Sequence, residues 1–191
     1  MSLLALLAAA TVLGPQRAPP VYVTPNYGLT FRPPKDTTYC PLPKGWVGSD
    51  HGTVLFLVPP ERCGDAGYPS VGRAFWPDVP RIEVYYGYWD PEGAPAVRCR
   101  QPVVSTAFMD GEYPLCEGAG SGPTTVTIQA IYPADTMAQV ALTLVTTPDR
   151  LEGDLKVLRD MAASTHACRA TDERTNFSFG TGAPCPPGKW F

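Results

Sequence analysis

Six cysteines are the residues of this sequence with the clearest chemical meaning. They are Cys40, Cys63, Cys99, Cys116, Cys168 and Cys185. An even number without a Cys-x-x-Cys motif is typical of a disulfide framework, because dithiol redox enzymes use that motif and structural zinc sites use closely spaced ligand pairs. The sequence therefore predicts structural disulfides in an oxidising compartment, with no metal site and no cofactor.

Pairing neighbours along the chain is the favoured hypothesis for these bridges. The pairs would be Cys40–Cys63, Cys99–Cys116 and Cys168–Cys185. Each bridge closes a loop rich in glycine and proline, which contributes about 3 kcal/mol in the chain-entropy model. A hairpin turning at Asp110-Gly111 would place Cys116 opposite Ser105. The middle bridge therefore requires a bulge or a looser turn.

The segment from Gly48 to Gly52 contains Ser49, Asp50 and His51, the residue types of a hydrolytic triad. Triad members converge from separate segments, whereas adjacent side chains of an extended segment point in alternating directions. We therefore expect a polar turn here and assign no catalytic residue, and a secreted hydrolase using His51 is kept as an alternative. Acids that could form a glycosidase pair are Asp78, Glu83, Asp110 and Glu112, among which only geometry can choose.

Aromatic side chains are concentrated between positions 75 and 89. A strand expected over residues 81–89 would place four of the candidate side chains on one face. Arginine with aromatic rings is typical of binding hot spots, but aromatic rings also dominate buried cores, and both interpretations stay open. The candidate binding residues are Arg81, Glu83, Tyr85, Trp89 and Trp76.

The first 14 residues are almost entirely apolar and no charge precedes Arg17. This run is too short to cross a hydrocarbon core of about 30 Å and fits the apolar region of a secretory signal. We expect a signal peptide over residues 1–18, with its cleavage position open, and no later membrane span. Arginine exceeds lysine, which favours a GC-rich bacterial genome. The expected location is therefore periplasmic or secreted.

Composition excludes some function classes. The net charge is −3 and only 17% of residues are charged, so there is no basic stripe of the kind that binds nucleic acid. A hydrophobic content of 44% argues against disorder. The 23 prolines indicate short strands joined by ordered loops.

The expected elements are mostly strands, identified by apolar runs and by alternation of apolar and polar residues. Strand candidates cover residues 21–23, 27–31, 53–58, 81–89, 96–99, 103–109, 124–132 and 139–147, with a linker over 15–20. A short helix starting at Pro133 competes with the beginning of the last strand.

One helix is predicted over residues 148–165. Thr147 is the expected N-cap, Pro148 stands at the first helical position, and Asp149 favours the positive end of the helix dipole. Apolar residues then recur at helical spacing, and Glu152 and Lys156 would form an i, i+4 pair. The apolar stripe is Leu151, Leu155, Leu158 and Met161.

These elements predict a single α+β domain over residues 19–168. An antiparallel or mixed sheet would be packed by the C-terminal amphipathic helix, and an irregular tail over 169–191 would be tied down by a disulfide. The expected function is that of an exported, non-catalytic binding protein whose partner is a protein or an envelope polymer. A periplasmic inhibitor or immunity protein is one specific form, and a structural envelope protein is a further alternative.

Overall fold

The fold was analysed in a computed structural model of the chain. It describes residues 14–24, 27–40, 52–61, 63, 78–88, 104–118, 125–134, 138–169 and 182–187.

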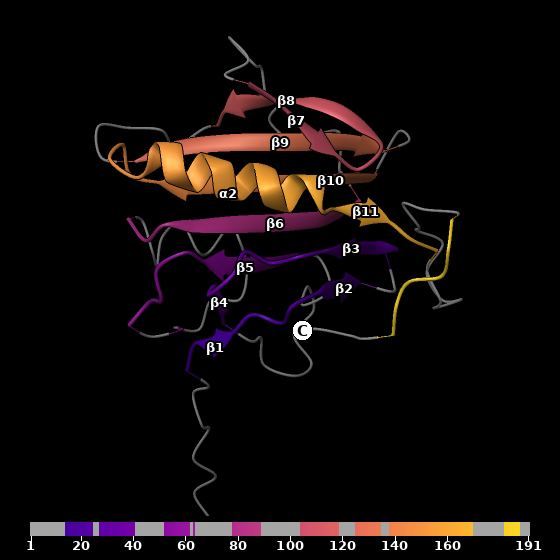
Figure 1. Ribbon diagram of the computed structural model, residues 1–191, viewed down its shortest axis with the longest axis horizontal. Coiled ribbons are helices and arrows are strands. Elements are labelled where there is room, and N and C mark those ends of the chain that lie inside the picture. Colours follow the sequence, from indigo (N-terminus) through magenta and orange to yellow (C-terminus); the bar gives the residue numbers. More distant parts are fainter. Residues whose placement is uncertain are drawn as a thin grey trace, which may run out of the picture.

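Most of the described strands form one large antiparallel sheet (Figure 1). Within the described residues its order is β1-β4-β5-β6-β10-β9-β8-β7. These strands are β1 (Gln16–Arg17), β4 (Thr38–Tyr39), β5 (Gly52–Phe56), β6 (Arg81–Tyr88), β7 (Val104–Phe108), β8 (Gly111–Glu117), β9 (Val126–Ala134) and β10 (Ala138–Thr146). The prediction of a sheet-rich single domain is confirmed.

The long central strands follow the alternation seen in the sequence. Val84 of β6 pairs with Leu142 of β10, which pairs with Ala130 of β9, and all three side chains are buried. Alternate residues of a strand point to opposite faces, so one face of the sheet collects these apolar side chains. β9 continues through Pro133, which rules out the competing helix at that position.

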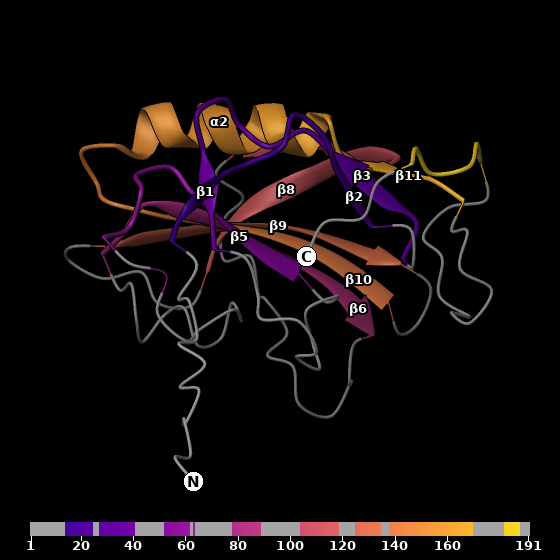
Figure 2. The ribbon, with the colours of Figure 1, turned by 90° about the horizontal axis from the view of Figure 1, so that it is seen from below.

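A second, smaller sheet lies on the same side of the large sheet as the helix (Figure 2). It has the order β11-β3-β2 and consists of β11 (His166–Ala167), β3 (Leu29–Phe31) and β2 (Tyr22–Thr24). Tyr22 stacks on Phe31 with ring centroids 4.7 Å apart. Side chains of this small sheet, of the helix and of the large sheet belong to one buried cluster.

The described residues contain one helix, α2 (Leu151–Ala163). It begins three residues later than predicted, because residues 148–150 form a turn and Arg150 occupies the N-cap. The Thr147 hydroxyl hydrogen-bonds to the Asp149 carboxylate and holds the pKa of Asp149 below its usual range. A hydroxyl engaged in this way competes with capping of the helix.

The four apolar residues of the predicted α2 stripe differ in burial. Leu158 and Met161 are buried, and Leu151 and Leu155 are partly buried against the core cluster. Lys156 pairs with Asp160 rather than with Glu152. No helix of the described residues is both long and apolar enough to span a membrane.

Two of the three expected disulfides are confirmed. Cys40 is bonded to Cys63, and Cys168 is bonded to Cys185. The second bridge ties the tail to the domain, where backbone hydrogen bonds join Arg169 to residues 183 and 185. The Cys99–Cys116 bridge stays a prediction, since Cys99 lies outside the described residues.

Two local predictions are corrected. The expected linker contains β1, in which Gln16 pairs with Tyr39 of β4. The hairpin between β7 and β8 turns at Met109-Asp110, one residue earlier than predicted, because Phe108 pairs with Gly111. Met109 adopts a positive φ of 57°, a conformation that its residue type gives no reason to expect.

Two glycines give a prediction with opposite signs. A Cβ at Gly52 would lie 2.2 Å from the Val84 carbonyl oxygen, so we expect Gly52→Ala to lower the free energy of unfolding by about 1–3 kcal/mol. A Cβ at Gly153 of α2 meets nothing within 4 Å, so Gly153→Ala should stabilise by about 1 kcal/mol. Urea unfolding of both variants checks this, and a loss of stability in both would contradict it.

The buried phenol of Tyr22 predicts a loss of stability at high pH. Desolvation by burial raises its pKa above the usual value, and hydrogen bonds with Tyr86 and Thr53 only partly oppose the shift. The folded state therefore keeps a proton that the unfolded chain loses above about pH 10. The stabilisation is complete below that pH and declines above it, by at most about 1.4 kcal/mol per pH unit.

Tyr22→Phe should reduce this decline, at a cost of about 1 kcal/mol at neutral pH from the lost hydrogen bonds. A smaller decline should remain, because burial also raises the pKa of Tyr39. Urea unfolding at several pH values between 8 and 11.5 would measure the difference between the two proteins. Parallel declines in wild type and variant would show that Tyr22 does not titrate in this way.

Candidate functional site

The predicted binding residues of β6 lie on the face of the sheet opposite to the core cluster. Arg81 and Glu83 are 1% and 4% exposed. They share this face because they are two positions apart on a strand, and the guanidinium donates from Nε to Glu83 Oε1 at 2.9 Å. Arg81 also donates from Nη1 to the Val79 carbonyl at 3.1 Å. The pair therefore satisfies its own charges in a buried position.

The other predicted binding residues are Tyr85, Trp76 and Trp89. Tyr85 is half-buried on β6, and Trp76 and Trp89 lie outside the described residues. The structure thus places Arg81 and Glu83 together without showing an open aromatic surface around them. A binding role for this face stays a prediction.

The candidate hydrolytic residues are not brought together into a catalytic site within the described residues. His51 lies outside the described residues, and His166 is exposed on β11. Glu83 is committed to Arg81, while Asp78, Asp110 and Glu112 are exposed. Among the described residues there is no group of three or more His, Cys, Asp or Glu side chains that could hold a metal ion.

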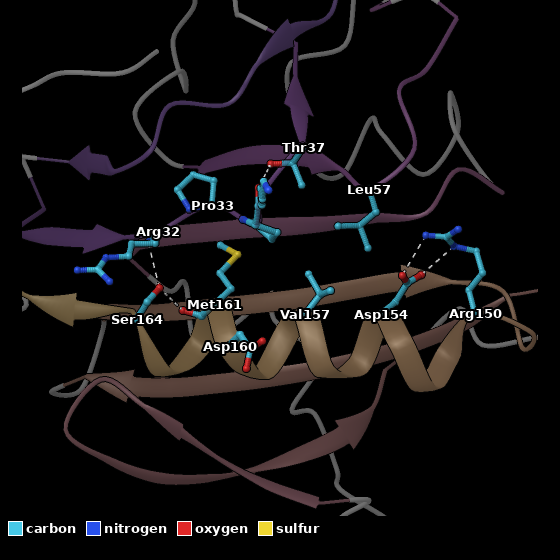
Figure 3. Close-up of a pocket in the computed structure, with 12 residues that line it drawn as sticks. Arg32, Pro33, Thr37, Leu57, Arg150, Asp154, Val157, Asp160, Met161 and Ser164 are labelled. Atoms are coloured by element: carbon cyan, nitrogen blue, oxygen red, sulfur yellow. Dashed lines mark hydrogen bonds and ion pairs between the residues drawn. The ribbon is translucent and has the colours of Figure 1, made fainter.

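A groove of about 540 Å³ runs along α2 and is the candidate site on which we focus (Figure 3). We call it the α2 groove. The residues that α2 and its ends contribute are Arg150, Asp154, Val157, Asp160, Met161 and Ser164. The facing wall consists of Arg32, Pro33, Pro34, Lys35, Thr37 and Leu57. The volume is that of an ordinary ligand site.

The wall opposite α2 is braced on both sides. At one end the Arg32 backbone N–H donates to Ser164 Oγ at 3.0 Å, and at the other the Ala18 N–H donates to the Thr37 carbonyl at 2.9 Å. Between them the Thr37 hydroxyl donates to the Pro34 carbonyl at 2.8 Å. Two prolines and this turn restrict the backbone, so the groove is formed without a ligand.

The end of the groove near the start of α2 carries a compensated charge. Asp154 is 6% exposed and receives two parallel hydrogen bonds from Arg150, Nε to Oδ2 at 3.1 Å and Nη2 to Oδ1 at 3.0 Å. The Thr146 hydroxyl donates to the same carboxylate. Burying a carboxylate is tolerable only with such partners, so this cluster fixes the start of α2 and is not available as a base.

The other charges of the groove do not cancel. Asp160 is paired with Lys156, and Asp36 in the opposite wall is paired with Arg17. Arg32 and Lys35 are exposed and have no ion-pair partner among the described residues. Within the described residues the groove therefore has an excess of positive charge, on a protein whose net charge is −3.

The α2 groove cannot be predicted from the sequence alone. Its two walls lie far apart in the chain, as the bond between Arg32 and Ser164 spans 132 residues. The available signal was a second stripe of α2 at positions 150, 154, 157, 161 and 164, beside the stripe that faces the core. That stripe marks one side of the helix, but it does not indicate which residues form the facing wall.

Comparisons with models of protein families, with curated proteins and with solved structures gave no match to this chain.

Proposed function

We propose that this chain is an exported, non-catalytic binding protein of the cell envelope, and that the α2 groove is where it holds its partner. The observation that carries the proposal is a pair of exposed cations that line the groove, Arg32 and Lys35, neither of which has an ion-pair partner in the part of the chain that the structure describes. Long cationic side chains bordering apolar surface favour recognition of a partner with complementary charge. The disulfides support an oxidising compartment outside the cytoplasm.

Affinity capture tests the role of the groove. The wild-type protein, immobilised, should retain a partner from an envelope extract of the organism that encodes it. Arg32→Glu combined with Lys35→Glu should lose that partner, because both changes reverse the charge of exposed side chains that line the groove.

The matched control is Arg159→Glu combined with Arg169→Glu, which reverses two exposed arginines that do not line the groove. This control should retain the partner. Equal retention by all three proteins would contradict the proposal. Loss of the partner only in Tyr85→Ala would move the site to the β6 face.

The first strand adds a prediction about the mature protein. Gln16 accepts a hydrogen bond from the Tyr39 hydroxyl at 3.2 Å, and Arg17 forms an ion pair with Asp36 at 3.0 Å. If a leader is removed, we expect the cut before Gln16, so that β1 is kept. Intact mass of the exported protein measures this, and a chain starting after Arg17 would contradict it.

A further inference from the structure

We propose that the α2 groove binds an extended peptide segment of a partner protein, with carboxylates at one end and apolar side chains beside them. This inference rests on the proposed function and adds the chemical class of the ligand. It follows from three features of the groove: a middle lined mainly by apolar side chains, polar groups at both ends, and an excess of positive charge.

The middle of the groove is lined by apolar side chains and by Asp160, whose carboxylate is paired with Lys156. Val157 and Met161 lie on α2 between the polar ends, and Leu57 lies across from them (Figure 3). Val157 and Leu57 are only partly buried. A ligand that covers their exposed area with its own apolar side chains would gain hydrophobic free energy.

The positive charge of the groove favours a ligand with negative charge. Arg32 lies beside Ser164 at the end of α2 (Figure 3). Lys35 lines the same groove, three positions further along the facing wall. Arginine binds carboxylates with two parallel hydrogen bonds, and a neighbouring lysine adds attraction without a fixed geometry. Carboxylates at this end of the ligand would therefore form ion pairs with Arg32 and Lys35.

The length and the polar ends favour a peptide. The 13 residues of α2 extend about 20 Å, which is the length of about six residues of extended peptide. A lipid chain has one polar end, whereas this groove has the Arg150–Asp154 pair at one end and Arg32 with Ser164 at the other. The described lining also contains no aromatic ring on which a base or a sugar could stack.

Fluorescence polarisation with labelled peptides tests the inference directly. The first peptide has two adjacent glutamates followed by alternating leucine and serine. A second has glutamines in place of the glutamates, and a third keeps the glutamates but has serines in place of the leucines. We expect the first to bind wild-type protein at least about tenfold more tightly than either of the others, and the binding to weaken as salt is added.

Variants of the protein locate the binding. Arg32→Gln with Lys35→Gln should weaken the first peptide at least about tenfold and leave the second peptide unchanged. The matched control, Arg159→Gln with Arg169→Gln, should bind the first peptide as wild type does. Circular dichroism of each variant confirms that the fold is retained.

Several outcomes would overturn the inference. Equal binding of the first two peptides would remove the role of the carboxylates, and binding to anionic phospholipid vesicles without binding to any peptide would replace the peptide by a lipid surface. If no peptide binds while affinity capture still depends on Arg32 and Lys35, the groove is a binding site for another ligand class. If capture is also independent of these residues, the proposed function fails as well.

Discussion

Glu83→Ala is expected to lower the free energy of unfolding by about 3–5 kcal/mol. The side chains of Arg81 and Glu83 are only 1% and 5% exposed, and their charged atoms are 2.9 Å apart. Removing the carboxylate would leave the buried guanidinium without the ion pair that Glu83 provides. An uncompensated buried charge costs far more than a broken ion pair at the surface.

The exposed pair Arg17–Asp36 supplies a matched control. Its charged atoms are 3.0 Å apart, but its side chains are 75% and 68% exposed. Asp36→Asn removes the charge, and asparagine tolerates the positive φ of this position. The substitution should lower the free energy of unfolding by less than about 1 kcal/mol. Urea unfolding of both variants measures the contrast. Similar small costs would indicate that solvent reaches the β6 face, which would favour the binding role predicted for it.

Removing the Cys168–Cys185 bridge is expected to have the second largest effect. The bridge closes a loop of 17 residues and lies in a small buried cluster with Val23 of β2. Cys168→Ala combined with Cys185→Ala should lower the free energy of unfolding by about 3 kcal/mol, because the unfolded chain gains loop entropy and the cluster loses packing.

This loss is measurable by urea unfolding without added thiol. The α2 groove contains neither cysteine, so peptide binding by the folded double variant should match that of wild type. Unchanged stability would mean that the tail contributes little to the fold. Lost peptide binding in a folded variant would show that the groove depends on the tail, contrary to its bracing by residues 18–37.

The sequence predicted the central part of the fold well. Strands β6, β9 and β10 lie within two residues of their expected ranges, because alternation of buried and exposed positions is a property of the chain itself. The existence of α2 was predicted from apolar residues that recur at helical spacing. Its start was wrong, since the Thr147 hydroxyl bonds to Asp149, and the sequence alone does not decide between this bond and a cap.

The sites were harder to predict because they depend on contacts between distant segments. Residue types marked Arg81 and Glu83 as polar candidates for a surface, whereas their mutual ion pair allows both to be buried. The α2 groove requires residues 32–37 to lie against α2, and no local pattern encodes that contact. Which charged residues of the groove could bind a ligand becomes clear only when the ion pairs of the folded protein are known.

The most direct test of the α2 groove as the binding site is site-specific photocross-linking. A benzophenone amino acid would replace Val157 in the groove or, in a control protein, the exposed Arg159 on the outer side of α2. After irradiation with envelope extract, we predict one cross-linked adduct from position 157, absent from position 159 and suppressed by an excess of the acidic, apolar peptide. Adducts of equal yield from both positions, or none from position 157 while the partner is still captured, would contradict the groove as the binding site.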